Sequence, residues 1–358
     1  MNTKSPLVFN FSGKPSADLE ALASKLRPVF EANGYSYVQA TDTPRVALNF
    51  LSGDGVRAYR RNIPETFVLS LLQASEDPEN PLEEWYPYLV RTLSNMLLVY
   101  IPGKKAHFFT LDLGYFVEDF GDDFYTRVFE RIHPMASAIL VVKNRFEPDL
   151  EPGLWEGDEL SKKLGEAGKK LGEWDLLPAA FPIDKILPPK DFRHVQRLYG
   201  IGGLSYGNLS VRKDEARFWM SASGVDKSRL RKIGRDILMV TGYDADENAI
   251  VLSVPSVVEP RRVSVDAIEH WLIYKEHPEV NAIIHVHAWM EGVPTTLFQY
   301  PCGTYQLGQA VAEKVREARD PAETIVGLKN HGLTVTGRSL SHILDRIDGK
   351  LLKHVPMG

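Results

Sequence analysis

The stretch Asn281–Ala288 constrains the fold more than any other part of this chain, because it sets two histidines in alternation within an apolar, β-branched run. Residues i and i+2 of a strand point the same way, with Cα atoms roughly 6.5 to 7 Å apart. The pattern therefore predicts a strand that carries His285 and His287 on one face. Two imidazoles so placed can converge on one metal ion, at about 2.0–2.1 Å from each nitrogen.

A third candidate ligand is His331, which follows the apolar run Ile325–Leu328 and precedes Gly332. The order predicts a short strand that ends in a polar turn. Three histidine ligands leave coordination positions open, which is the pattern of catalytic rather than structural metal sites. The alternative is that these histidines have a structural role, which is the more common role of a single histidine.

Length and composition limit the class of protein. At 358 residues, two domains are expected, and a net charge of −5 gives no basic field for nucleic acid or an anionic membrane. Cys302 is the only cysteine, which excludes an intramolecular disulfide and a cysteine-based zinc site. The N-terminus lacks the apolar region of a signal peptide, and no apolar run is long enough to span a bilayer. These features predict a cytoplasmic protein.

The first 145 residues predict a separate α/β domain. Leu19, Leu22, Ala23 and Leu26 recur at helical spacing, so a helix is expected over 16–33. Strand-like runs at 45–51, 66–72, 96–101 and 136–142 alternate with helical patterns at 82–95 and 122–132. No chemical motif lies in this part, and its role is left open.

The rest of the chain divides in two. Residues 146–184 are rich in proline and charge and predict a linker with one solvated helix. Residues 185–358 predict helices at 191–200 and 306–318 around a group of strands that includes the histidine strand. The simplest architecture is an α/β/α sandwich on a mainly antiparallel sheet.

Five motifs in this second half occur in a recognisable order. They are Gly207–Arg212, Ser221–Gly224, Asp236–Val240, the His285/His287 pair and Asn330–Leu333. In this order they resemble the class II aldolase/adducin family over about residues 185–350. The resemblance implies an α/β/α sandwich with a divalent metal at its mouth, most often zinc, with manganese or iron as alternatives. It also implies that His285, His287 and His331 are the ligands.

The family's phosphate site has a partial counterpart here. Its residues correspond to Ser205, Gly207, Asn208, Ser223, Gly224 and Ser264. Glycine turns and small hydroxyls can hold a phosphate or carboxylate without a deep basic pocket. The alternative is that the glycines only form turns, and Val265 stands where the family has a second serine.

The resemblance assigns the catalytic acid/base to Asp266, where the aldolases carry glutamate. Its shorter side chain leaves two roles open, a base or a fourth metal ligand. His270 follows one helical turn later and is expected to orient Asp266 or to fill space beneath the metal. The segment after the histidine strand is shorter than in the family, and the family's C-terminal tyrosine is missing. Tyr305, Tyr206 or the N-terminal domain is expected to supply the missing proton donor.

Together these features predict a metal-dependent lyase or isomerase for a small hydroxy-carbonyl substrate, phosphorylated or carboxylated, that works through a metal-stabilised enediolate. One alternative is a non-catalytic, adducin-like binding or scaffold protein, and another is a non-haem iron enzyme. The resemblance also implies that the protein forms a homo-oligomer. Its expected binding partner is a small-molecule substrate.

Overall fold

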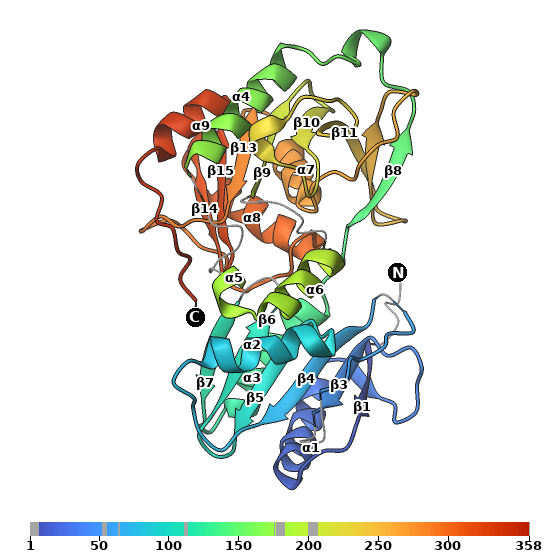
Figure 1. Cartoon of the computed structure of the whole chain (residues 1–358), viewed down its shortest axis with the longest axis vertical. Coiled ribbons are helices and arrows are strands. Elements are labelled where there is room, and N and C mark those ends of the chain that lie inside the picture. Colours follow the sequence, from blue (N-terminus) through green and yellow to red (C-terminus); the bar gives the residue numbers. More distant parts are fainter. Residues whose placement is uncertain are drawn as a thin grey trace. The chain divides into compact units, whose positions relative to one another are not determined.

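The computed structural model describes residues 7–51, 56–63, 65–110, 114–174, 176, 183–199 and 207–357. Contacts divide the chain into two units (Figure 1). The first comprises Met1–Ser137, Ile183–Gln196 and Met357–Gly358, and the second comprises Ala138–Pro182 and Arg197–Pro356. Among the described residues no helix is long and apolar enough to cross a membrane.

The first unit is built on one sheet whose described strands follow the order β2-β1-β3-β4-β5-β6-β7. The strands are β1 (Leu7–Ser12), β2 (Tyr35–Tyr37), β3 (Val46–Phe50), β4 (Phe67–Gln73), β5 (Met96–Ile101), β6 (Lys105–Thr110) and β7 (Tyr115–Asp119). The first five run parallel, β6 pairs antiparallel with β5, and β7 pairs antiparallel with β6. The helices are α1 (Ala17–Ala32), α2 (Pro81–Thr92), α3 (Phe124–Ala136) and α5 (Ile183–Ile186), followed by α6 (Pro189–Tyr199), which begins in this unit.

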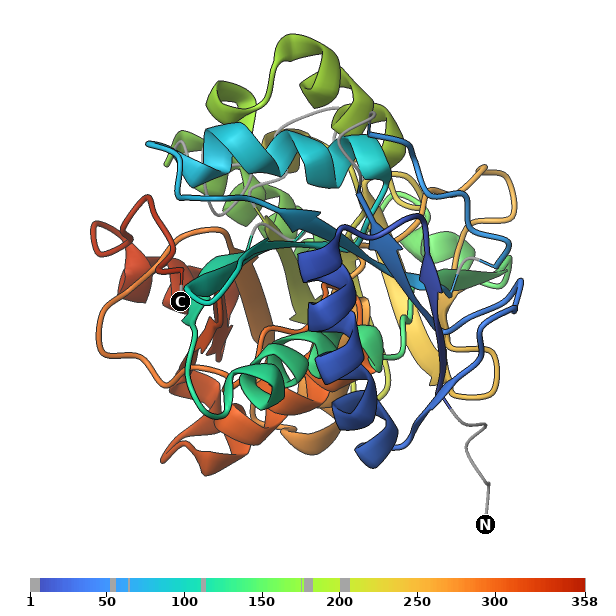
Figure 2. The same ribbon diagram turned by 90° about the horizontal axis from the view of Figure 1, so that it is seen from below.

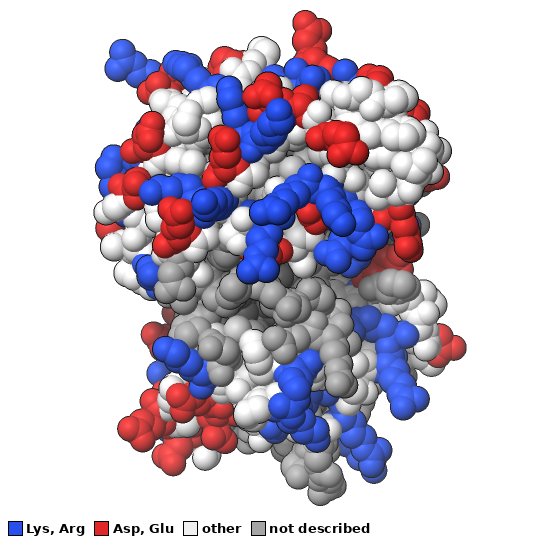
Figure 3. All heavy atoms as spheres, turned by 45° about the horizontal axis from the view of Figure 1, so that its top comes forward, with Lys and Arg blue, Asp and Glu red and all other residues white. Residues whose placement is uncertain are grey.

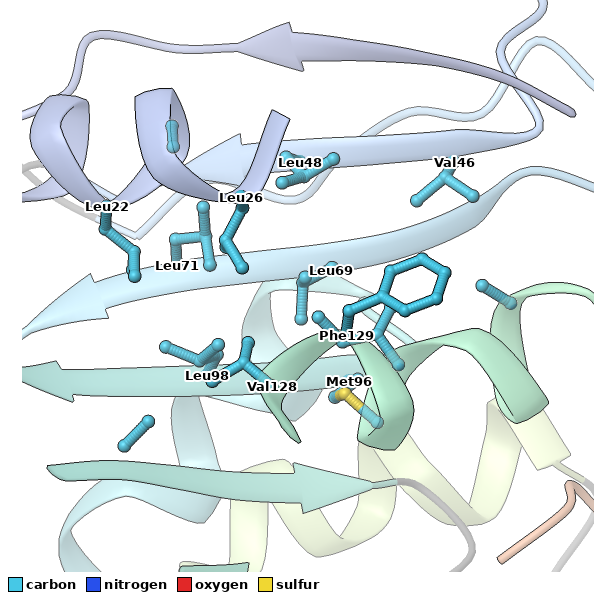
Figure 4. Packing of buried hydrophobic residues seen from close by; sticks show 14 of the residues in the cluster. Leu22, Leu26, Val46, Leu48, Leu69, Leu71, Met96, Leu98, Val128 and Phe129 are labelled. Atoms are coloured by element: carbon cyan, nitrogen blue, oxygen red, sulfur yellow. The ribbon is translucent and has the colours of Figure 1, made fainter. Parts of the chain in front are cut away.

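The core of this unit lies between the sheet and the pair α1 and α3, which run side by side (Figure 2). Helix α1 begins where the Ser16 hydroxyl accepts a hydrogen bond from the Leu19 amide, and it buries the predicted apolar face. Figure 4 shows Leu22 and Leu26 of this face above the strands, with Val128 and Phe129 of α3 in the same cluster. The helix predicted over 16–33 is therefore confirmed.

The strand predicted over 136–142 is wrong. Helix α3 continues to Ala136, and Leu140 makes only an isolated bridge to Thr304, beside the bond from the Val141 amide to the Gly303 carbonyl. The apolar run lies against the segment before α8 (Tyr305–Glu317) instead of joining a sheet. The strand that follows is the polar β8 (Lys143–Glu147), parallel to β12 (Ala249–Ser253).

The second unit has the predicted α/β/α layering. Its sheet has the order β14-β15-β13-β9-β10-β11-β12-β8, and apart from the β12/β8 pair its described neighbours are antiparallel. The remaining strands are β9 (Gly207–Arg212), β10 (Phe218–Ser221), β11 (Ile237–Asp244), β13 (Ala282–Val286), β14 (Ile325–Leu328) and β15 (Gly332–Gly337). Its longer helices are α4 (Glu159–Glu173), α7 (Ala267–Glu276), α8 (Tyr305–Glu317) and α9 (Leu340–Ile347).

Two adjacent residues of β10 show which helices cover which face. The Phe218 ring packs on Tyr274 of α7, at 4.8 Å between centroids. The Trp219 indole N–H donates to Asp158, which caps α4. Neighbouring strand residues point to opposite faces, so α7 and α4 lie on opposite sides of the sheet. Helix α8 packs with α7, and α9 packs with α4.

Helix α4 lies in the segment predicted to be a linker, yet it is part of this fold. It begins at a capping box between Asp158 and Ser161, and its inner face buries Leu164, Ala167 and Leu171. Gly168 is required there, because a Cβ atom would lie 2.1 Å from the Lys227 carbonyl oxygen. Both β8 and α4 thus belong to the second unit, and the helix is solvated only on its outer face.

Candidate functional site

Three histidines meet at one end of the second sheet. His285 lies in β13, paired with Asn208 of β9 on one side and with Thr334 of β15 on the other. His287 follows the end of that strand, and His331 lies between β14 and β15. Donor atoms of the three rings all lie within 4.8 Å of one another. The structure therefore brings together the three residues proposed as ligands.

The spacing of two rings suits a tetrahedral metal. The Nε2 atoms of His287 and His331 are 3.3 Å apart. That distance matches the edge, roughly 3.3 to 3.4 Å, of a tetrahedron with metal–nitrogen bonds of about 2.0–2.1 Å. No rearrangement of the strands is needed for these two rings to share an ion.

The turn that carries His331 depends on its neighbours. Asn330 adopts a left-handed backbone conformation, with φ of 59°, which asparagine tolerates better than most residues. Gly332 is needed because a Cβ atom there would lie 2.3 Å from the Val286 carbonyl oxygen. This close approach places His331 beside the end of the histidine strand.

Burial keeps His285 and His331 neutral. His285 is 1% exposed, and among the described residues neither of its ring nitrogens has a hydrogen-bond partner. Burial, with the nearby His287 and His270 rings, holds the pKa of His285 well below its usual value. Burial and the rings of His285 and His287 lower the pKa of His331 in the same way, opposed by Asp266. Neutral imidazole is the metal-binding form, and an ion would satisfy one of the two orphaned nitrogens of His285.

Asp266 lies beside this cluster at the start of α7. One carboxylate oxygen accepts a hydrogen bond of 2.7 Å from the Asn208 side-chain amide, and the other has no partner in the part of the chain that the structure describes. The side chain is buried, and its charge acts on His331. One free carboxylate oxygen near three imidazoles can serve as a base or as a further ligand.

The His270 amide donates to the Asp266 carbonyl at 3.2 Å, and the hydrogen bonds of its ring go to Ser210, so they do not orient the Asp266 carboxylate. Its Nδ1 atom is 2.7 Å from the Ser210 hydroxyl, which also pairs with the Tyr274 hydroxyl at 2.8 Å. Burial lowers the pKa of His270 to about 3, so the ring is neutral. The position one turn after Asp266 points the ring at β9, where it supports the strand of Asn208.

Glu269 is a buried acid that the sequence pattern did not reveal. One of its oxygens accepts a 2.6 Å hydrogen bond from the Thr334 hydroxyl, and no described residue hydrogen-bonds to the other. Burial, reinforced by the Asp266 charge, raises the pKa of Glu269 to about 8. The side chain is therefore protonated at neutral pH. Thr334 pairs with His285 across the sheet, so this acid lies next to the histidine strand.

Replacing Glu269 with glutamine is expected to remove a pH dependence of stability. In the native state the acid stays protonated to about pH 8, whereas the unfolded chain ionises above about pH 4.5. The contribution of Glu269 to the free energy of unfolding of the metal-free protein should therefore fall between these values, at a limiting slope of about 1.4 kcal/mol per pH unit. The buried histidines contribute with the opposite sign below about pH 6.5 in both proteins, so urea denaturation across this range should give a more negative slope in the wild type than in Glu269→Gln. The exposed Glu259→Gln is the control, and equal slopes in all three proteins would contradict the assignment.

The described residues of the predicted anion site gather near the start of α7. Asn208 contacts Asp266, the Ser264 amide donates to the Ser221 carbonyl, and the Ser223 amide donates to the Arg262 carbonyl. Gly224 is exposed, with a left-handed φ of 66°. Gly207, with a φ of 136°, begins β9 opposite Val286. Ser205 and Tyr206 lie outside the described residues.

Lys227 supports this loop and was missed in the sequence, where it is an ordinary lysine in a polar run. Its ammonium group donates to the carbonyls of Ala222 and Val225, at 3.3 and 3.1 Å, which flank Ser223 and Gly224. Burial lowers the pKa of Lys227 to about 8. A cation beneath the loop favours an anion above it.

Tyr305 is not brought to the histidines. It is the first residue of α8, its ring stacks on Tyr243 of β11 at 5.9 Å, and its amide donates to the Ile139 carbonyl. Within the described part of the chain, no contact joins its hydroxyl to the three rings. Its role as proton donor remains a prediction without support from these contacts.

Comparison with known proteins gives one family. Residues 192–297 match the family model described as "Class II Aldolase and Adducin N-terminal domain", a range that includes Asp266, His285 and His287. Methylthioribulose-1-phosphate dehydratases of Citrobacter koseri and Enterobacter sp. are 36% and 40% identical to this chain over 81 residues. Each match covers 23% of this chain and 34% of the relative, so the chain spans about a third of their length.

Solved structures of two aldolases are similar at lower identity. An L-fuculose 1-phosphate aldolase aligns over 54% of this chain and 81% of its own, with 19% identity and a TM-score of 0.37. The L-fuculose-1-phosphate aldolase of Thermus thermophilus aligns over 52% and 86%, with 18% identity and a TM-score of 0.31.

Proposed function

We propose, from the membership of residues 192–297 in the class II aldolase and adducin family, that the second unit is a divalent-metal-dependent lyase or isomerase for a small hydroxy-carbonyl compound. The observation that carries this proposal is the convergence of three imidazoles whose donor atoms lie within 4.8 Å of one another. Burial leaves His285 and His331 neutral and ready to bind an ion.

In this proposal His285, His287 and His331 hold the metal, zinc first, with manganese and iron as alternatives. The bound ion supplies a Lewis acid for the carbonyl and hydroxyl oxygens of the substrate. Asp266 moves or holds the proton, since Asn208 fixes one of its oxygens and leaves the other free. The same free oxygen would make Asp266 a ligand if it turned to the ion.

The substrate in this proposal carries a phosphate or carboxylate group. Its binding residues are Ser205, Gly207, Asn208, Ser223, Gly224 and Ser264. The buried charge of Lys227 beneath the Ser223–Gly224 loop and the N-terminus of α7 both favour an anion. The name of the sequence relatives, methylthioribulose-1-phosphate dehydratase, favours a phosphorylated substrate.

Two other functions differ from this one in testable ways. A non-catalytic scaffold is disfavoured because all three histidines are present and converge. A non-haem iron enzyme would use the same three ligands, and the identity of the metal separates it from a lyase, since zinc has no redox chemistry. The partner in either enzyme is a small molecule.

The face of the molecule drawn in Figure 3 carries charges of both signs, in keeping with the net charge of −5.

Metal analysis of anaerobically purified protein, followed by an assay with methylthioribulose 1-phosphate and L-fuculose 1-phosphate, tests the proposal. We expect about one equivalent of metal and turnover of one of these substrates or of a related ketose phosphate. Protein that holds no metal and takes none up on reconstitution would favour the scaffold.

Asp266→Asn is expected to keep the fold and the metal and to lose turnover by about 10² to 10⁴-fold, the usual contribution of a positioned acid or base. The amide keeps the size of the side chain but cannot take a proton. The measurement is kcat with metal content determined on the same sample. Asp246→Asn, at an exposed hairpin, is the matched control. Unchanged turnover would exclude a base, and loss of the metal would make Asp266 a ligand instead.

A further inference from the structure

Lys227 is a buried lysine with no acid in direct contact with its charge. The residue is 1% exposed, and in the described part of the chain no carboxylate oxygen lies within 4.0 Å of its ammonium group. A charge in the interior is costly unless an opposite charge or several hydrogen bonds compensate for it. The described residues therefore leave this cation without a negative partner at contact distance.

The ammonium group lies beneath the loop proposed to hold an anion. It donates to the carbonyls of Ala222 and Val225, at 3.3 and 3.1 Å, which flank Ser223 and Gly224. These bonds use two of the three N–H donors of an ammonium group. Gly224 is exposed, whereas the lysine is not. A positive charge thus lies on the protein side of a loop whose tip is open to solvent.

Helix α4 packs on the segment that carries this lysine. A Cβ atom at Gly168 would lie 2.1 Å from the Lys227 carbonyl oxygen, and one at Gly165 would lie 2.9 Å from the Leu230 carbonyl oxygen. The two glycines therefore let the helix and the segment approach closely, and the inner face of α4 is largely apolar. An apolar cover excludes water, which would otherwise weaken the attraction between this charge and an anion.

Two carboxylates act on the Lys227 charge from a greater distance. Asp226 precedes it in the chain, but that carboxylate accepts a 2.6 Å hydrogen bond from the Ser228 hydroxyl and pairs with Arg229 at 3.4 Å. The other is Asp266, the proposed acid/base. Burial, opposed by these two carboxylates, lowers the pKa of Lys227 to about 8, so the ammonium form prevails at neutral pH.

We propose that Lys227 is a positioning residue for the substrate anion, an inference that rests on the proposed function and deepens it. Its two hydrogen bonds hold the Ser223–Gly224 loop in its shape, and its positive charge favours an anion on the outer side of that loop. The anion contacts the loop and not the lysine. A neutral side chain of similar size would fill the same space but remove the attraction.

Equilibrium dialysis with radiolabelled sulfate tests this role without relying on turnover. Sulfate stays doubly charged over the range of pH used, so only the protein titrates. At neutral pH and constant ionic strength, Lys227→Met should bind sulfate at least about tenfold more weakly than the wild type. Lys232→Met removes an exposed lysine of the same segment and is the matched control, with the affinity of the wild type. Lys227→Arg keeps the charge and should restore most of the affinity.

The pH dependence is a readout that a purely structural role would not change. The affinity of the wild type for sulfate should fall as the pH rises through about 8, where Lys227 loses its proton, and Lys227→Met should show no such fall. Glu269 gains a negative charge in the same range, so the series is repeated in Glu269→Gln, where the fall should persist. A fall that disappears in Glu269→Gln would overturn the proposal. This series also decides the question if Lys227→Met does not fold, because Glu269→Gln retains the lysine.

Turnover separates this role from that of Asp266. Lys227→Met should raise KM by more than it lowers kcat, since the lost attraction acts on bound substrate and transition state alike. Equal sulfate affinity in the wild type and in folded Lys227→Met, or no sulfate binding by the wild type, would overturn the proposal without affecting the proposed metal site. Absence of bound metal from protein that binds sulfate through Lys227 would instead overturn the proposed function alone.

Discussion

His285→Ala is expected to reduce the affinity of the protein for zinc by at least about a hundredfold and to abolish turnover. Loss of a group that only orients a ligand already costs about 10- to 100-fold in affinity. His285 is central to the cluster, since its strand lies between β9 and β15. Among the described residues neither of its ring nitrogens has a hydrogen-bond partner. The measurement is metal content by inductively coupled plasma mass spectrometry, with a zinc titration of the metal-free protein.

The matched control is His342→Ala, which makes the same substitution outside the site and should retain the metal. His331→Ala should behave like His285→Ala, because it removes another proposed ligand of the same metal ion. Full metal content in both site variants would show that the ion binds elsewhere. The proposed function would then fail.

Gly207→Ala is expected to lower the free energy of unfolding by about 3 kcal/mol or more, which is a large effect for one methyl group. The φ of 136° already disfavours any other residue, and a Cβ atom there would lie 1.9 Å from the His285 carbonyl oxygen. The clash would separate β9 from β13, the strands that carry Asn208 and His285. The free energy of unfolding measured in urea and the affinity for zinc should therefore both decrease.

Gly292→Ala separates the two causes. Gly292 also has a positive φ, of 74°, but nothing lies within 4 Å of the added carbon. It should cost only the backbone strain, about 1 to 2 kcal/mol, and leave zinc binding unchanged. If the two variants proved equally stable, the contact between Gly207 and the histidine strand would not be the reason for glycine at that position.

Local patterns explain which parts of the site could be predicted. The alternation of His285 and His287 predicted their common face, and the order of five motifs indicated the family whose model matches residues 192–297. The proximity of these histidines to Asp266 depends on pairing between strands that are far apart in sequence. It was expected only from the family resemblance. The burial of Glu269 and Lys227 had no such signal, because a charged residue in a sequence reads as exposed until its neighbours are placed.

The errors have similar causes. The run Ala136–Val142 is apolar enough for a strand, but it packs on the segment before α8 without a ladder of hydrogen bonds. In α4 the many lysines and glutamates masked a buried stripe of Leu164, Ala167 and Leu171. Composition predicted a solvated helix, whereas three apolar positions on one face were enough to pack it on the sheet.

The place of β8 and α4 in the second unit decides how this chain can be shortened. A fragment cut at the limit of the family resemblance, near residue 185, would lack both elements. The polar edge strand would be gone and β12 would present unpaired backbone groups, while one face of the sheet would lose the helix that covers Trp219. Such an edge recruits other chains, so the shortened protein should aggregate, and a fragment that begins at Ala138 should not.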